Sequence, residues 1–262
     1  MIMSKQITSI LSLIVLFSFA SCKGEDCLVI SKETGDIRFS LVDTTEVGIT
    51  TRTSLNLDVN EFNVSLSRGE EQIFSNRKYK DIAGNTISCS ATPGYVLTAE
   101  NCNESEAESA NLGWGQPRVR GEETFTVIAN ETTNVTVICG LVNSSVNVDF
   151  SDSIEDLFSE YSIEIHATDA ADRTFTFDQS NNQYKIAYFN VDESGRKLAY
   201  TVTLPSPYKT YTGTIDMESS KNYTLSVKVE DDDSNSTVKL GLIVDGTLLK
   251  EEVLTEKINP YI

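Results

Sequence analysis

The segment ETFTVIANETTNVTVICGLVNSSVNVDF, residues 123–150, decides the fold class of this chain. Three runs within it, 123–129, 132–139 and 144–150, are rich in Thr, Val and Phe and are separated by Asn and Gly. Such runs, with polar neighbours at alternate positions and turn residues at their ends, are typical of strands. Three strands this close together, with no helical pattern between them, indicate antiparallel sandwiches.

The same alternation continues on both sides of this segment. Before it, apolar and polar residues alternate in 37–42, 62–67 and 94–101. After it, seven further runs have strand character: 161–167, 173–178, 184–191, 197–204, 211–216, 223–230 and 236–245. We count about six strands before residue 143 and about eight after it. The sequence therefore predicts an all-β chain with two consecutive antiparallel β-sandwich domains, Ig-like or transthyretin-like, over residues 37–142 and 143–262.

One short helix is expected between the strands of the second domain. Apolar residues recur there at every third or fourth position: Ile154, Leu157, Phe158 and Tyr161. This spacing gives a one-sided apolar stripe on a helix. Asp152, with Glu155 three residues later, fits the pattern of a helix start.

Residues 1–22, MIMSKQITSILSLIVLFSFASC, have the form of an export signal. Lys5 precedes an apolar stretch from Ile10 to Phe19, which is too short to span a bilayer and fits a signal-peptide core. The ending Phe-Ala-Ser-Cys resembles the bacterial lipobox, in which the cysteine is lipidated and becomes the mature N-terminus. We predict lipidation of Cys22; the alternative is an ordinary signal peptide with a cysteine just beyond its cleavage site.

Residues 23–36, KGEDCLVISKETGD, are predicted to form a flexible tether. Their start, Lys-Gly-Glu-Asp, resembles the short acidic signals that send lipoproteins to the outer face of the outer membrane in Bacteroidota-type bacteria. The alternative is a merely solvated tether. We therefore expect a protein that is lipid-anchored in the cell outer membrane and exposed at the surface.

The charge of the chain argues against one class of partner. There are 39 acidic residues against 21 Lys and Arg, a formal net charge of -18. Nucleic-acid binders need a basic surface to neutralise phosphates. No nucleic-acid partner is expected.

Four cysteines remain after Cys22, and an exported chain can keep them oxidised. They are Cys27, Cys89, Cys102 and Cys139. Cys102 follows one predicted strand and Cys139 ends another, so we predict a Cys102–Cys139 disulfide that stabilises the fold by about 4 kcal/mol. The alternative is that the thiols are buried and unpaired.

The sequence offers no set of catalytic residues. His166 is the only histidine, and its alternation with Ile163 and Ile165 places it on the outer face of a strand. Neither GxSxG nor HExxH occurs. The acidic run Glu230–Asp233 matches no calcium loop and is better interpreted as a solvated hairpin tip. We predict that the protein is not an enzyme and has no cofactor and no metal site.

Trp114, the single tryptophan, lies in a Gly-Trp-Gly sequence within the long polar loop 101–121. An exposed tryptophan on a loop would be a binding anchor, because aromatic residues dominate recognition surfaces. The alternative is that Trp114 folds back as a plug over the end of the first sandwich.

The stretch 94–148 resembles a family of predicted Bacteroides lipoproteins of unknown function that are often described as cell-adhesion or fimbrillin-like. Three pieces carry the likeness: YVLTAENC, the loop around Gly113-Trp114-Gly115, and FTVIANETTNVTVICGL. The resemblance implies a β-sandwich protein on the outer membrane, and it carries no catalytic residues.

Fimbrillin-type subunits polymerise when a strand of one subunit fills a groove in the next, after cleavage behind a basic residue removes an N-terminal strand. Arg52 is the nearest match to such a cleavage site, and Arg38 is another, although neither lies in a close match to the family context. The C-terminal segment 248–262 is either a strand available for exchange or the last strand of its own sheet.

Two hypotheses for function follow. The first is a surface adhesin or fimbria-associated subunit, whose partners are other fimbrial subunits, a host protein or a glycan. The second is a surface carbohydrate-binding lipoprotein of a glycan-uptake system, suggested by Trp114 and the tyrosine content. Because the chain has a single tryptophan, the adhesin hypothesis is favoured over the carbohydrate-binding one.

Overall fold

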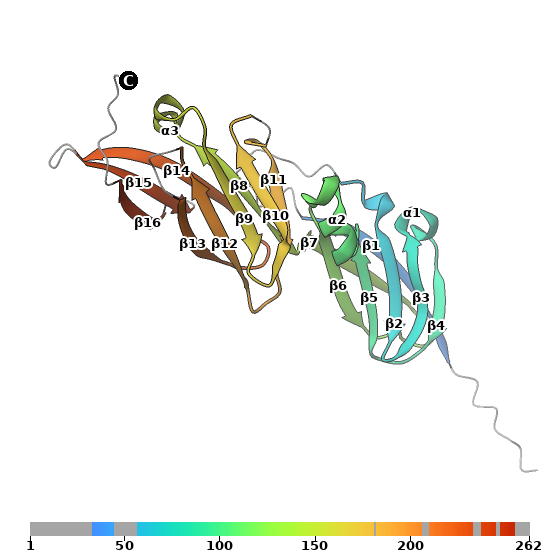
Figure 1. The fold of residues 1–262 in the computed structure, drawn as a ribbon. Helices are drawn as coiled ribbons and strands as arrows, with labels where there is room; N and C mark the ends of the chain where they lie inside the picture. Colours follow the sequence, from blue (N-terminus) through green and yellow to red (C-terminus); the bar gives the residue numbers. More distant parts are fainter. Residues whose placement is uncertain are drawn as a thin grey trace, which may run out of the picture. The chain divides into compact units, whose positions relative to one another are not determined.

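The computed structural model describes residues 33–44, 57–180, 182–205, 210–232, 237–244 and 247–254. Over these residues the chain is built mainly of strands (Figure 1). They are β1 (Thr34–Asp43), β2 (Asn63–Arg68), β3 (Glu71–Lys78), β4 (Ile87–Ser90), β5 (Tyr95–Glu100), β6 (Val119–Phe125), β7 (Thr132–Leu141), β8 (Asn143–Phe150), β9 (Ser162–Ala167), β10 (Ala170–Asp178), β11 (Ile186–Asn190), β12 (Arg196–Thr203), β13 (Thr210–Met217), β14 (Asn222–Asp232), β15 (Thr237–Val244) and β16 (Thr247–Leu254).

The helices are short. They are α1 (Tyr79–Ile82), α2 (Glu104–Ser109) and α3 (Asp152–Leu157), with single 3-10 turns η1 (Val59–Glu61) and η2 (Asn111–Gly113). No helix in the described part of the chain has the length and apolar character needed to cross a membrane.

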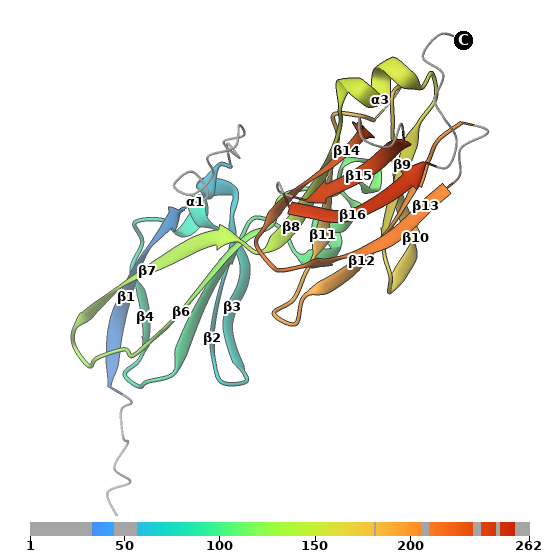
Figure 2. The same cartoon turned by 90° about the vertical axis from the view of Figure 1, so that its left-hand side faces the viewer.

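Strands β1 to β7 form the first sandwich (Figure 2). Their order is β3-β2-β5-β6-β7-β1-β4, and β6 meets β7 only at the pairs Val119–Leu141 and Arg120–Gly140. Apolar side chains from both sides of this junction share one buried core, which includes Ile37, Val64, Leu66, Leu97 and Val137. The alternation in the sequence produces this core because every second residue of a strand points to the same face.

Strands β8 to β16 form the second sandwich. One sheet has the order β10-β9-β12-β13 and the other β11-β8-β14-β15-β16. Its core is separate from the first and includes Val148, Ile163, Phe177, Phe189 and Leu198. The prediction of an all-β chain with sandwich architecture is confirmed, with seven strands before residue 143 and nine that begin at or after it in the described residues.

Two strand pairs depart from the predicted antiparallel pattern. The first strand of each sandwich runs parallel to a later neighbour, β1 beside β7 and β8 beside β14. A parallel neighbour requires a long connection. In both sandwiches the intervening strands supply it, and alternation within a strand says nothing of its neighbour's direction.

The predicted helix is present as α3, but its start differs from the prediction. Ser151 is the N-cap residue, and no side chain caps this end. The helix ends before Phe158, which is already extended. Ile154, Phe158 and Tyr161 are nevertheless buried, so the apolar stripe identified the buried side of the segment.

The ends of the described chain refine two expectations. Strand β1 begins at Thr34, so residues 34–36 of the predicted tether are part of a sheet. β16 pairs antiparallel with β15, which makes the described part of segment 248–262 the last strand of its own sheet. Residues 255–262 lie outside the described residues. Asp232 pairs with Thr237 at the end of the β14–β15 ladder, as expected for the hairpin at the acidic run.

Candidate functional site

The segment between β5 and β6 contains two short helical elements, α2 and η2. We call residues 103–117 the arm. It starts with a capping box: the Asn103 side chain accepts from Glu106 N at 2.9 Å, and Asn103 N donates to Glu106 Oε2 at 2.9 Å. Ala107 on α2 is fully buried. After η2 the arm turns back, and Gly115 N donates to Ala110 O at 2.9 Å.

The base of the arm is fixed by two asparagine side chains. Val119 N donates to Asn101 Oδ1 at 2.8 Å, and Asn101 N donates to Val119 O at 3.1 Å. Asn143, the first residue of β8, accepts from Arg118 N at 2.9 Å and donates to Gln116 O at 2.8 Å. Asn143 is 1% exposed, so these bonds satisfy a buried amide. The start of the second sandwich is thereby tied to the end of the arm.

Trp114, on the arm, packs against the core of the second sandwich. Its ring lies 5.1 Å from Phe175 and 5.1 Å from Phe177, both on β10, and Lys185 Nζ lies 4.7 Å from its centroid. The side chain is half-buried. Trp114 does fold back, but onto the second sandwich and not onto the first. Its ring is occupied by these contacts, so a sugar stacking on it would have to displace Lys185.

Glu108 connects the arm to the second sandwich by charge. Its Oε1 lies 3.3 Å from Arg173 Nη1 and 3.2 Å from Arg196 Nη1. Arg173 Nε also donates to the carbonyl of Gly113 at 3.1 Å. Burial lowers the pKa of Arg173, and the Glu108 carboxylate acts in the opposite direction. The Glu108 carboxylate thus pairs with two half-buried guanidinium groups, and Arg196 also pairs with Asp169 Oδ1 at 3.0 Å.

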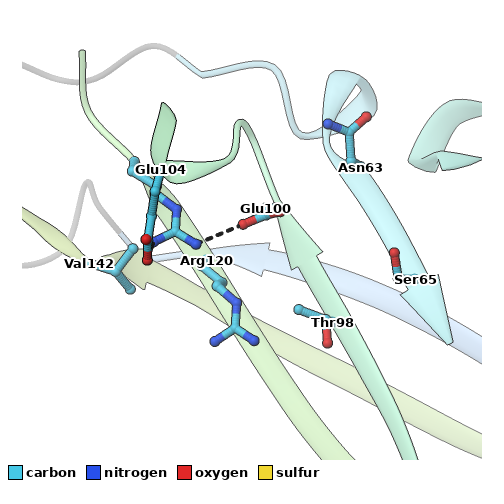
Figure 3. Close-up of a pocket in the computed structure, with 8 residues that line it drawn as sticks. Asn63, Ser65, Thr98, Glu100, Glu104, Arg120 and Val142 are labelled. Atoms are coloured by element: carbon cyan, nitrogen blue, oxygen red, sulfur yellow. Dashed lines mark hydrogen bonds and ion pairs between the residues drawn. The ribbon is translucent and has the colours of Figure 1, made fainter. Parts of the chain in front are cut away.

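A polar pocket of about 440 Å³ lies beside the base of the arm (Figure 3). Arg118, only 14% exposed, dominates it: Nη2 lies 3.0 Å from Glu100 Oε2 and Nη1 lies 2.9 Å from Glu104 Oε1. The remaining lining residues come mainly from β2, β5 and β6: Asn63, Ser65, Thr98, Arg120 and Val142.

The chemistry of this pocket is that of a polar contact surface. Glu100 and Glu104 both pair with Arg118, so the two carboxylates are already engaged. Hydroxyl, amide and guanidinium groups around them can exchange hydrogen bonds with a polar ligand. Its lining supplies no aromatic ring.

The predicted Cys102–Cys139 disulfide is absent from the structure, because both residues are buried free thiols. Cys102 Sγ faces Asn101 Oδ1 at 3.5 Å and the Pro117 carbonyl at 4.0 Å. Cys139 belongs to the core of the first sandwich, where burial raises the pKa of its thiol to about 11. The alternative interpretation, buried unpaired thiols, describes both residues. Chain order placed each cysteine at a strand end but could not show which way its side chain points.

The other residues singled out from the sequence do not gather at this site. His166 lies half-buried on β9, on the face opposite Ile163 and Ile165. Arg38 is exposed within β1. Cys22 and Arg52, the predicted lipidation and processing residues, lie outside the described residues. Within those residues no group of His, Cys, Asp and Glu side chains could hold a metal ion.

Sequence reasoning missed the contribution of Glu108, Arg173, Arg196 and Asn143. They are ordinary polar residues in the sequence, and no spacing rule relates the arm to Asn143, 27 residues after Gln116, or to Arg173, 60 residues after Gly113. The capping pattern Asn103-x-x-Glu106 was the one available signal for α2.

Comparison with known proteins places the chain among β-sandwich proteins. A family model described as "Domain of unknown function (DUF4493)" matches residues 33–260. No curated protein gives a match. The fimbrial anchor protein Mfa2 from Porphyromonas gingivalis is similar over 84% of this chain and 100% of its own, at 9% identity and a TM-score of 0.50.

Two further solved structures are similar at lower scores. One, described as a "putative adhesin from Bacteroides ovatus", is similar over 85% of this chain and 95% of its own, at 10% identity and a TM-score of 0.46. The other, a "putative cell adhesion protein from Bacteroides eggerthii", covers 83% of this chain and 96% of its own, at 10% identity and a TM-score of 0.44. At such identities a likeness shows the fold alone.

Proposed function

The chain belongs to the family described as Domain of unknown function (DUF4493), and we propose that it is a non-enzymatic surface lipoprotein of the outer membrane, an adhesin-like or fimbria-associated subunit. The observation that carries this proposal is the double β-sandwich, similar in fold to the fimbrial anchor protein Mfa2 along that protein's full length. The lipobox ending in Cys22 supports anchoring, and the acidic start of the tether supports display at the surface.

The position of β1 supports a role in subunit assembly. β1 lies between two neighbours, antiparallel to β4 and parallel to β7 over eight residue pairs. Cleavage after Arg52 would separate this strand from the rest of the chain and leave unpaired the edges of β4 and β7 to which it is bonded. Unpaired strand edges accept a strand from another chain through main-chain hydrogen bonds.

The same cleavage would also separate the lipid on Cys22 from both sandwiches. An uncut chain is therefore the anchored form, and a cut chain is a form released for assembly. Arg52→Ala discriminates between them. If processing occurs at this residue, the variant stays wholly in the membrane fraction while the wild type yields a shorter released form; identical fractionation of the two means that Arg52 is not a processing site.

Protease shaving of intact cells tests the location. We expect the wild-type chain to be digested on whole cells and the Cys22→Ala variant to lose membrane attachment. Protection of the wild type until the outer membrane is broken would refute surface display. Screening the shaving-positive protein against fimbrial subunits, matrix proteins and glycans then tests adhesion; failure to bind any of them would leave the adhesin hypothesis without support.

A further inference from the structure

Strand β11 is an edge strand whose free side is covered. It pairs only with β8 in the five-stranded sheet of the second sandwich. A bare edge strand presents N–H and C=O groups to which another strand can pair. The arm lies against this side of β11.

Four backbone groups on the free side of β11 have partners. Tyr188 N donates to the Trp114 carbonyl at 2.8 Å, and Tyr188 O accepts from Arg173 Nη2 at 2.7 Å. Asn190 N donates to Glu108 Oε1 at 3.2 Å, and Asn190 O accepts from Arg196 Nη1 at 3.0 Å. Two of these partners belong to the arm, and the other two are the arginines that pair with Glu108. The backbone groups that would otherwise bond to a neighbouring strand are therefore bonded to the arm and to the two arginine side chains.

The fit of the arm on β11 leaves no room for an added methyl group at Gly115. A Cβ there would lie 2.9 Å from Tyr188 Cβ, 3.0 Å from Arg173 Nη2 and 3.1 Å from the Ala107 carbonyl. Gly113, two residues earlier, has a similar positive φ of 89° against 84° at Gly115, but a Cβ there would meet nothing within 4 Å. The two glycines thus share the backbone requirement and differ in the room for a Cβ, which at Gly115 is taken by Tyr188, Arg173 and the arm's own Ala107 carbonyl.

We propose that the arm is an autoinhibitory edge cover: seated, it closes β11 to strand pairing, and lifted, it lets β11 pair with the β11 edge of a second copy of this chain. The free edges of two copies are self-complementary, because antiparallel strands related by a two-fold axis exchange the same N–H and C=O groups. Exposed apolar side chains favour this occupant: Tyr184, in the turn two residues before β11, is 91% exposed, and Ile186, the first residue of the strand, is 36% exposed.

Gly115→Ala, with Gly113→Ala as its control, tests the proposal in the full chain purified in detergent. Light scattering gives the protein mass, and hydrogen exchange of the peptide 186–190 reports the state of the edge. We expect the wild type and Gly113→Ala to be monomers with protected Tyr188 and Asn190 amides. Gly115→Ala is expected to double in mass as the concentration rises, and to lose at least tenfold in protection of those amides when diluted to the monomer.

Glu108→Gln is the second variant, for the case that Gly115→Ala does not fold. It removes the charge that pairs with both arginines without adding an atom, and Glu160→Gln, an exposed glutamate of the same sandwich, is its control. A faster exchange of peptide 186–190 together with self-association supports the proposal. Faster exchange in a chain that stays monomeric at every concentration overturns it, as does unchanged exchange in both variants.

Discussion

Replacing Trp114 with alanine is expected to destabilise the second sandwich, although the residue lies in the sequence before β6. Truncating a fully buried tryptophan costs about 3–5 kcal/mol. Trp114 is half-buried, which leaves about 2 kcal/mol, and its contacts with two rings at 5.1 Å contribute about 1 kcal/mol more. The expected loss is therefore about 3 kcal/mol, and it should fall on the sandwich that holds Phe175 and Phe177.

Hydrogen exchange at increasing urea concentrations measures this loss for each sandwich separately. We expect the opening free energy of β12 to fall by about 3 kcal/mol and that of β5 to change by less than about 0.5 kcal/mol. Leu112→Ala is the matched control, because Leu112 belongs to the same arm and is 99% exposed; it should leave both values unchanged. A loss in β5 with β12 unaffected would refute the assignment of Trp114 to the second core.

Three more predictions concern the first sandwich and the arm base. Arg118→Met leaves two carboxylates without their shared partner and should lower the free energy of unfolding by about 2 kcal/mol in urea titrations. Burial raises the pKa of Cys139 to about 11, so as the pH rises the unfolded chain loses the thiol proton before the folded chain does. The free energy of unfolding should therefore fall by about 2 kcal/mol between about pH 9 and about pH 11. Cys139→Ala should reduce this dependence on pH. Gly121→Ala places a Cβ 2.3 Å from the Ile138 carbonyl oxygen and should lower the free energy of unfolding by about 3 kcal/mol in thermal or urea titrations. Gly140→Ala is its control, because the nearest atom to a Cβ there, Thr44 Oγ1, lies at an ordinary contact distance of 3.7 Å, and the variant should be almost as stable as the wild type.

The alternation of apolar and polar residues was sufficient to predict the strands, because it depends only on which face of each strand is buried. A strand with one buried face must place apolar residues at every second position, as β9 does with Ile163 and Ile165. Which strands become neighbours depends on the whole chain. The parallel placement of β1 beside β7 joins residues 34–43 to residues 132–141, and neither segment carries a mark of the other.

The helix starts illustrate the limit of a local rule. Asp152 and Glu155 fit the capping pattern, yet the N-cap there is Ser151 with no side-chain cap. Asn103 and Glu106 fit the same pattern, and both of their hydrogen bonds form. An apolar stripe drew attention to the first pair. The pair Asn103 and Glu106 stands in a polar stretch without such a stripe. The helix that it starts, α2, packs against β11, a strand of the second sandwich.

Trp114 and the two cysteines could not be placed from the sequence for a related reason. A tryptophan between glycines is able to point outward or inward, and the choice depends on an acceptor surface formed by β10. A disulfide depends on the distance and direction of two Cβ atoms. Cys102 faces a loop carbonyl and Cys139 faces a core, so proximity to strand ends was not enough.

The arm also bears on the boundary predicted between residues 142 and 143. A chain cut there would lose Trp114 from the second core and the carbonyl that pairs with Tyr188, so the second sandwich depends on a segment that precedes the boundary. Cleavage after Arg52 has the opposite consequence. It would remove β1 from the first sandwich and leave the arm on the same piece as β11, which opens one strand site while the other stays closed. Assembly through the proposed site in the first sandwich would then proceed without competing self-association through the second.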